Sequence, residues 1–244
     1  MIDRITNAQI ASESPAFAKP MLAEVPLGGV PISEVYLMDC VEGMKYYPDK
    51  YFDLAICDPP YGIHDKLCRK DSPKNKSKFN TLYYEKQWDK ERPKKSFWNE
   101  VFRVSKNQVV FGANYFCNEL PISRGWAYWH KQGEKMSSVN DELIWTSFDI
   151  SIKKFSRCHG MDKGFMSDHK VFHPTTKPVA LYDWVFSNYS ESGMKVLDTH
   201  LGSGSSRISA NKNGLNFVGF EIDEEYFNKQ NKRYADFTAQ TRLW

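Results

Sequence analysis

The last third of the chain carries the stretch that decides the fold: Lys195-Val196-Leu197-Asp198, Leu201-Gly202-Ser203-Gly204-Ser205 and Asn216-Phe217-Val218-Gly219-Phe220-Glu221. The first run predicts a short buried strand, and the glycines of the second predict a tight turn. We expect a helix from this turn to about residue 213, and a second strand that ends at Glu221. Together these elements predict a nucleotide-binding type of strand–turn–helix–strand unit, and therefore an α/β fold.

The glycine turn and Glu221 suit an adenosine-type ligand. Gly202 and Gly204 allow the backbone to approach a ligand closely, where a Cβ would clash. Glu221 follows about twenty residues later at the next strand end, where an acid can bind two ribose hydroxyls. The third glycine of the dinucleotide fingerprint is missing, so a purely structural turn is the alternative.

A second turn lies earlier, where the apolar run 51–57 ends at Asp58-Pro59-Pro60-Tyr61. Paired prolines end a strand, which places Asp58 at the strand's carboxyl end, where parallel sheets bind ligands. A carboxylate and the Pro59 carbonyl could both accept from an exocyclic base amine and direct its lone pair at a methyl group, with Pro60 stiffening the turn. Tyr61 offers a face to a flipped base. A rigid turn with a capping aspartate is the alternative.

Residues 64–95 are basic and contain few aliphatic side chains, so they predict a mobile loop. Aromatic side chains alternate with the lysines, and Lys74, Lys76 and Lys78 are candidate contacts to nucleic-acid phosphates. A solvated insertion is the alternative. Residues 1–30 are broken by prolines and predict an irregular arm, whereas residues 31–244 predict a single domain.

The middle of the chain predicts further regular elements. Helical spacing runs through 97–104, and strands are expected at 108–111 and 125–130, with a hairpin partner or neighbour at 142–148. A helix is expected from about 179 to 189, after a proline suited to a first helical turn. Residues 149–172 are polar and rich in turn formers.

Composition favours a reduced, cytoplasmic setting. The five cysteines include no C-x-x-C pair, which argues against a disulfide framework. No apolar run approaches the roughly 20 residues of a membrane span, and the start lacks the pattern of a signal peptide. Cys158, His159, His169 and His173 match no zinc pattern, so we expect no metal. The net charge of +3 does not by itself indicate a polyanionic partner.

After the N-terminal arm, the chain resembles the DNA amino-methyltransferases, which methylate adenine at N6 or cytosine at N4. The motifs behind this resemblance are Met38-Asp39-Cys40, Asp58-Pro59-Pro60-Tyr61-Gly62, Trp129-His130-Lys131, His173-Pro174-Thr175-Thr176-Lys177-Pro178, residues 196–205 and Gly219-Phe220-Glu221-Ile222-Asp223. It implies the Rossmann-like fold of S-adenosylmethionine-dependent methyltransferases: a mostly parallel seven-stranded sheet, one antiparallel strand and helices on both faces. The tetrapeptide precedes the glycine turn, as in the family's beta-type order.

The resemblance also implies roles for individual residues. The expected catalytic group is Asp58, Pro59, Pro60 and Tyr61. The expected cofactor-binding group is Asp39, Cys40, Thr176, Lys177, Asp198, His200, Gly202, Ser203, Gly204, Ser205, Glu221 and Ile222. Within it, Asp39 should bond the adenine amine, Glu221 the ribose, and Thr176 and Lys177 should lie near the carboxylate. His200 stands where the family usually has phenylalanine, so we expect its ring to pack in that place.

The implied substrate is double-stranded DNA, and adenine N6 is the expected target. The family tends to have Asp at the first tetrapeptide position for adenine and Ser for cytosine N4, although cytosine N4 stays open. The segment 133–171 should read the target sequence, with Lys131 as a further DNA contact. Because this segment is short, a homodimer could share recognition.

Two other classes remain as alternatives. The chain could methylate RNA or a protein amide, although Asn rather than Asp58 would have favoured the amide. It could also be a catalytically silent DNA-binding relative. The intact Asp58, Tyr61, Gly202, Gly204 and Glu221 argue against a silent copy.

Overall fold

The computed structural model describes residues 31–63, 89–131, 141–156 and 176–241. The expected N-terminal arm, and Lys74, Lys76 and Lys78 of the basic loop, lie outside these residues. So does most of the expected recognition segment 133–171. These assignments, and the boundaries given to them, stay predictions.

A single mixed sheet forms the centre of the described part, with eight strands in the order β1-β8-β7-β2-β3-β5-β4-β6. The strands are β1 (Ser33–Leu37), β2 (Phe52–Cys57), β3 (Ser105–Phe111), β4 (Trp126–His130), β5 (Glu142–Thr146), β6 (Lys153–Ser156), β7 (Lys195–Asp198) and β8 (Asn216–Glu221). Among them β5 alone runs against the others, because its pairings with β3 and β4 are antiparallel and the remaining pairings are parallel. The expected mostly parallel sheet with one antiparallel strand is confirmed.

The strand count differs from the expected seven, and β6 lies where no strand was expected. This strand belongs to the polar stretch 149–172 and pairs with β4 alone. Its four residues are half-buried or exposed, because it lies at the edge of the sheet. Such a strand lacks the apolar alternation that marks a half-buried one, so a pattern search misses it.

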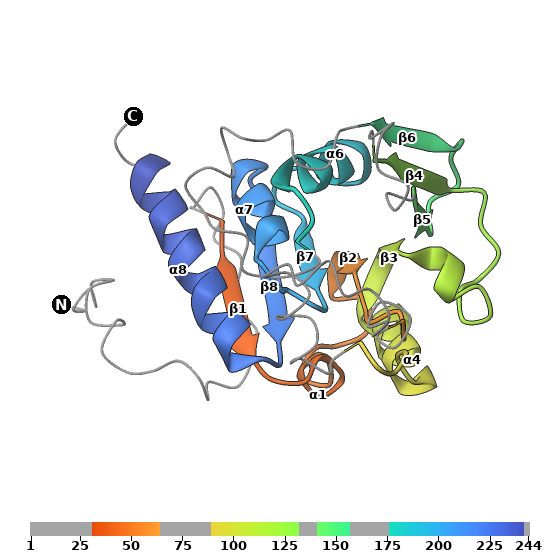
Figure 1. Cartoon of the computed structure of the whole chain (residues 1–244), viewed down its shortest axis with the longest axis horizontal. Coiled ribbons are helices and arrows are strands. Elements are labelled where there is room, and N and C mark those ends of the chain that lie inside the picture. The colour runs from red at the N-terminus through yellow and green to blue at the C-terminus, as the bar shows by residue number, and fades with distance from the viewer. Residues whose placement is uncertain (1–30, 64–88, 132–140, 157–175, 242–244) are drawn as a thin grey trace, which may run out of the picture.

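Helices cover both faces of the sheet, as expected (Figure 1). α1 (Cys40–Met44) and α4 (Lys95–Val104) pack with one group of buried side chains, and α6 (Val179–Tyr189) and α7 (Ser205–Lys212) with the other. A short 3-10 helix, η2 (Ala113–Tyr115), follows β3, and α8 (Glu224–Thr241) follows β8. None of these helices is long and apolar enough to cross a bilayer.

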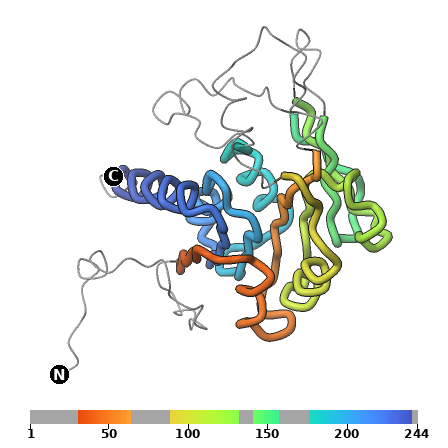
Figure 2. The backbone as a smooth tube through the Cα atoms, turned by 60° about the horizontal axis from the view of Figure 1, so that its bottom comes forward, coloured from red at the N-terminus to blue at the C-terminus, as the bar shows by residue number. Residues whose placement is uncertain are grey.

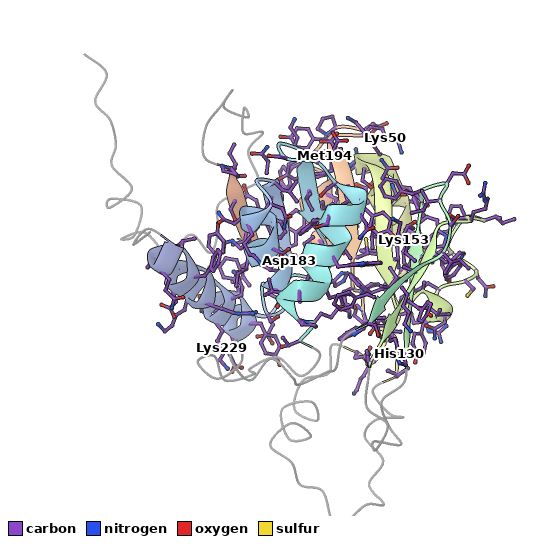
Figure 3. All side chains as sticks on the ribbon, turned by 90° about the horizontal axis from the view of Figure 1, so that it is seen from above. Lys50, His130, Lys153, Asp183, Met194 and Lys229 are labelled. Carbon is purple, nitrogen blue, oxygen red and sulfur yellow. The ribbon has the colours of Figure 1, made fainter. Side chains whose placement is uncertain are left out.

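Distant parts of the chain meet at the carboxyl edge of the sheet. β1 pairs in parallel with β8, so Leu37 lies opposite Glu221, and the first strand lies beside the last third of the chain (Figure 2). Figure 3 labels Lys50 and Met194, which precede β2 and β7, on the side where the parallel strands begin. His130, the last residue of β4, is labelled on the opposite side, where they end. The turns that follow β1, β2, β7 and β8 therefore gather at one edge.

Candidate active site

A cavity of about 320 Å³ lies at this carboxyl edge. Its walls include the turns after β1, β2, β7 and β8 and the segment before α6. It brings together these members of the predicted cofactor set: Asp39, Cys40, Thr176, Lys177, His200, Gly202, Ser203, Glu221 and Ile222. Asp58 and Pro60 of the tetrapeptide line the same cavity. The two turns singled out in the sequence thus face one space.

Glu221 fixes the glycine turn through backbone donors. Its Oε2 accepts from the Gly202 amide at 2.8 Å, and its Oε1 accepts from the amides of Ile222 at 3.0 Å and Asp223 at 2.9 Å. An ionised carboxylate has about four acceptor positions, so one remains for a ligand hydroxyl. This carboxylate can therefore shape the turn and bind a ligand at the same time.

Asp198 supports the same turn from behind. Its Oδ1 accepts from the His200 amide at 2.9 Å, and its Oδ2 accepts from the Ser206 hydroxyl. The side chain is buried, and burial raises its pKa to about 7. Arg233 of α8 donates to the Ser203 carbonyl at 2.8 Å and to the Ser205 hydroxyl at 3.0 Å. Asp198 and Ser205 are thus supports of the turn outside the cavity lining.

Gly204 also lies outside the lining, as the N-cap residue directly before α7. Its φ is +73°, and a Cβ at this position would lie 3.1 Å from Cβ of Gln230. A side chain would therefore be strained and would press on α8. The glycine is required by the backbone here, whatever its distance from a ligand.

His200 packs as an aromatic ring against α4. Its ring meets Phe97 edge to face, with centroids 5.4 Å apart at 61°. Its Nδ1 lies 2.9 Å from the Thr199 hydroxyl. Burial lowers its pKa to about 4, so the ring is neutral near pH 7. This environment fits the expected substitute for phenylalanine.

Asp39 lies between β1 and α1 and caps α1. Its Oδ1 accepts from the amides of Val41 at 2.9 Å and Glu42 at 3.1 Å, while Oδ2 has no partner among the described residues. Cys40 beside it is buried, and burial raises the pKa of its thiol to about 12. The thiol is therefore protonated and suited to packing, and the free oxygen of Asp39 can accept from a ligand.

Asp58 lies in a cluster of charged side chains, which we call the Asp58 network: Asp58, Tyr61, Lys131, Glu142 and Lys177. The Lys177 ammonium lies 2.6 Å from Asp58 Oδ1 and 3.2 Å from Glu142 Oε1. The Tyr61 hydroxyl lies 2.7 Å from Asp58 Oδ1 and 3.0 Å from Glu142 Oε1, and its single proton serves one at a time. Lys131 donates to the other oxygen of Glu142 at 2.9 Å. The two carboxylates thus share Lys177, and Glu142 has Lys131 as a second ammonium partner.

Burial makes these charges depend on one another. The Lys177 side chain is only 5% exposed and that of Glu142 10%. Burial raises the pKa of Asp58, although Lys177 opposes it. Burial also works against ionisation of Glu142, but Lys177 and Lys131 lower its pKa to about 2. Glu142 has two ammonium partners and Asp58 has one, so the surrounding charges favour the ionised form of Glu142 more strongly.

Tyr61 is held by its backbone as well as by its hydroxyl. Its amide donates to Asp89 Oδ1 at 2.6 Å, and one face of its ring stacks on Tyr115 with centroids 5.0 Å apart. Gly112 has a φ of +60°, and a Cβ there would lie 2.4 Å from the Tyr61 ring. The Tyr61 ring is thus packed between protein groups, and Tyr61 is not among the residues that line the cavity.

Glu142 is a site residue that the sequence pattern does not single out, because the pattern marks it only as the start of a strand. The signal was an acid before the apolar run Leu143-Ile144-Trp145. Lys131, the expected DNA contact, instead has its ammonium on Glu142 and over the Trp129 ring, 4.5 Å from the ring centroid. The described residues contain no cluster of three or more candidate metal ligands. Cys158, His159, His169 and His173 lie outside them.

Solved structures share this fold at low sequence identity. The PvuII DNA methyltransferase, described as cytosine-N4-specific, matches 84% of this chain and 87% of its own, with a TM-score of 0.60 and 16% identity. The complex of M1.HpyAVI with S-adenosylmethionine matches 83% of this chain and 99% of its own, with a TM-score of 0.52 and 17% identity. The expected α/β methyltransferase fold is thus confirmed.

Sequence comparison identifies the family. The type II methyltransferase M.HinfI of Haemophilus influenzae is 24% identical over 81% of this chain and 67% of its own length. The family model described as DNA methylase, for N6 and N4 methyltransferases, matches residues 85–232, which is more than half of the chain. The chain therefore belongs to the N6/N4 DNA methylase family, whose members are S-adenosylmethionine-dependent DNA methyltransferases.

Proposed function

We propose that this protein transfers a methyl group from S-adenosyl-L-methionine to the N6 amine of adenine in double-stranded DNA. The observation that carries this proposal is the shared cavity. Asp58, at the end of β2, and the glycine turn with Glu221 line the same space. A carboxylate that can accept from a base amine therefore faces the cofactor turn across one cavity.

The lining of the cavity fits the cofactor. Glu221 retains an acceptor position for a ribose hydroxyl, and Asp39 retains Oδ2 for the adenine amine. Ile222 is exposed and lines the cavity, so it can cover an adenine ring. When bound, S-adenosyl-L-methionine supplies an electrophilic methyl group on a positively charged sulfur. Three further residues of the predicted cofactor set would not touch the cofactor but would keep the shape of the turn that binds it: Asp198, Gly204 and Ser205.

Asp58 would prepare the target amine for attack. Its carboxylate and the Pro59 carbonyl would accept from the amine, which concentrates the nitrogen lone pair on the side facing the methyl carbon. This nitrogen would gain the methyl group that the bound cofactor supplies, with the electron pair of the broken C–S bond left on the cofactor sulfur. The nitrogen then loses one proton to solvent by way of Asp58.

Adenine is favoured over cytosine by Asp58 alone, through the family tendency at the first tetrapeptide position. The fold does not choose between the bases, because the PvuII enzyme, which shares it, is described as cytosine-N4-specific. Cytosine N4 is the second candidate. The beta-type motif order, the contacts of Lys74, Lys76 and Lys78 with DNA, and a homodimer belong to the proposal on sequence grounds.

The test uses purified full-length protein, S-adenosyl-L-methionine and unmethylated bacterial DNA. The DNA is digested to nucleosides, which are separated and identified by mass spectrometry. We expect N6-methyladenine, and none in a parallel reaction with Asp58→Ala. N4-methylcytosine without N6-methyladenine would overturn the choice of base. Methyl transfer to RNA or protein but not to DNA would overturn the substrate.

A further inference from the structure

Glu142 reaches the active site from the opposite direction to the other residues of the Asp58 network. It is the first residue of β5, which runs against its neighbours β3 and β4. The first residue of an antiparallel strand lies at the edge where the parallel strands end. The direction of β5 therefore brings an acidic side chain to the carboxyl edge, beside Asp58.

The contacts of Glu142 are divided between its two oxygens. Oε1 faces the Lys177 ammonium at 3.2 Å and the Tyr61 hydroxyl at 3.0 Å, both of which also contact Asp58. Oε2 accepts from Lys131 at 2.9 Å. Glu142 thus holds the two groups that hold Asp58, and Lys131 holds Glu142.

The two oxygens of Asp58 differ as a result. Oδ1 accepts from both Lys177, at 2.6 Å, and Tyr61, at 2.7 Å. Oδ2 has no partner among the described residues, and Asp58 lines the cavity. One oxygen is therefore fixed by protein donors, and the other is available to a target amine.

Glu142 also balances charge. If Asp58 were the one acidic partner of the buried Lys177, the ammonium would neutralise that carboxylate. Asp58 would then be a weaker hydrogen-bond acceptor for the target amine. In the observed arrangement the ammonium is shared between two carboxylates. Because the attacking nitrogen becomes positive during methyl transfer, an uncompensated ammonium beside it would raise the barrier.

We propose that Glu142 is a positioning residue for methyl transfer, which acts by holding Lys177 and Tyr61 on Oδ1 of Asp58 and leaving Oδ2 to the target amine. This inference rests on the proposed function of Asp58. It gives β5 a part in the reaction, although Glu142 belongs neither to the tetrapeptide 58–61 nor to the glycine turn.

The test compares Glu142→Gln with a matched control, Asp141→Asn. The control removes a carboxylate one residue away, where Asp141 is half exposed and pairs with His130. Both variants are checked for folding by circular dichroism and thermal melting. At saturating DNA and cofactor we expect kcat to fall about tenfold to a hundredfold in Glu142→Gln, less than for a group that touches the reacting atoms. We expect a change of less than about twofold in Asp141→Asn, and unchanged cofactor affinity in both.

A second readout does not depend on activity. The Asp58 carboxyl carbon is followed by ¹³C NMR during a pH titration, and its signal is assigned by its loss in Asp58→Asn. In Glu142→Gln we expect Asp58 to titrate at lower pH than in the wild type, because a repelling charge is gone and Lys177 is shared no longer. Asp141→Asn should titrate like the wild type. The other groups that act on Asp58 are unchanged in both variants: Lys177, Tyr61, Cys57, Tyr182 of α6 and Asp198 of β7.

The two readouts separate the two proposals. If the wild type transfers no methyl group to DNA, the proposed function fails, and the titration still decides the place of Glu142. If the wild type is active but Glu142→Gln keeps both its kcat and its Asp58 titration, the positioning role is overturned. A folded Glu142→Gln variant with a lower kcat and a lower Asp58 pKa supports it.

Discussion

The two turns that face the cavity are held in different ways. The cofactor turn is fixed by backbone amides, since Glu221 accepts from three of them and Asp198 from a fourth. The catalytic turn also has backbone amides that are held, since Tyr61 and Gly62 both donate to Asp89, but its Asp58 carboxylate is held by buried charges, because Asp58 and Glu142 share Lys177. A turn held by backbone bonds keeps its shape when a nearby charge changes. An arrangement held by shared charges does not, so the catalytic half should respond more strongly to single substitutions of charged side chains.

Removal of the Asp58 carboxylate should have the largest effect on methyl transfer of the substitutions considered. Asp58→Ala deletes the acceptor for the target amine, so methyl transfer should fall by at least about a thousandfold. The cofactor turn does not depend on Asp58, and cofactor affinity should stay within about threefold. Methyl transfer from tritiated cofactor and calorimetric titration of the cofactor measure the two quantities. Appreciable methyl transfer by this variant would show that another group activates the amine.

Removal of the shared ammonium should come next. Lys177→Met leaves two buried carboxylates without their common partner, which should lower stability by about 3 kcal/mol. With the attraction of Lys177 gone, the pKa of Asp58 should rise further. The carboxylate works when ionised, so activity is lost as pH falls through that pKa, and the acid limb of kcat against pH should move to higher pH. Denaturant unfolding measures the loss of stability, and a profile of kcat against pH measures the shift of the acid limb. An unmoved acid limb would contradict the inference that Lys177 lowers the pKa of Asp58.

The same difference explains how much of the site could be predicted from the sequence. Glu221 and Gly202 are 19 residues apart and belong to one strand–turn–helix–strand unit, so local pattern predicts their meeting. Tyr61 and Glu142 are 81 residues apart, and Tyr61 and Lys177 are 116 apart. Their contact depends on the order and direction of the strands, which no local pattern contains.

The fold divides along similar lines. The buried strand β7 and the helices α4 and α6 have apolar patterns that match the structure. The sequence does not predict β1 as a strand, because Tyr36 is its one buried residue and the apolar pattern is therefore weak. α1 is five residues long, too short to show a helical period. Elements with little buried surface of their own depend on partners elsewhere in the chain.

On the cofactor side, Glu221→Gln should have a moderate and separable effect. The glutamine amide has one acceptor oxygen and no negative charge. It cannot accept hydrogen bonds from both the backbone of the turn and a ribose hydroxyl as the carboxylate does. Loss of a charge-assisted hydrogen bond corresponds to about tenfold to a hundredfold weaker cofactor binding. The Asp58 network is unchanged, so kcat at saturating cofactor should stay within about threefold. A large loss of kcat with unchanged affinity would place Glu221 in the chemistry instead.

The smallest effect is expected at His200, where the chain departs from the usual family residue. The ring is buried, neutral near pH 7 and packed edge to face on Phe97, so its shape matters more than its nitrogen atoms. Phenylalanine can make the same ring contact, although Thr199 would lose the hydrogen bond to Nδ1. His200→Phe should therefore change kcat and cofactor affinity by less than about threefold and leave the pH profile unmoved. A loss of more than a hundredfold, or a shifted acid limb, would show that the histidine takes part in the reaction.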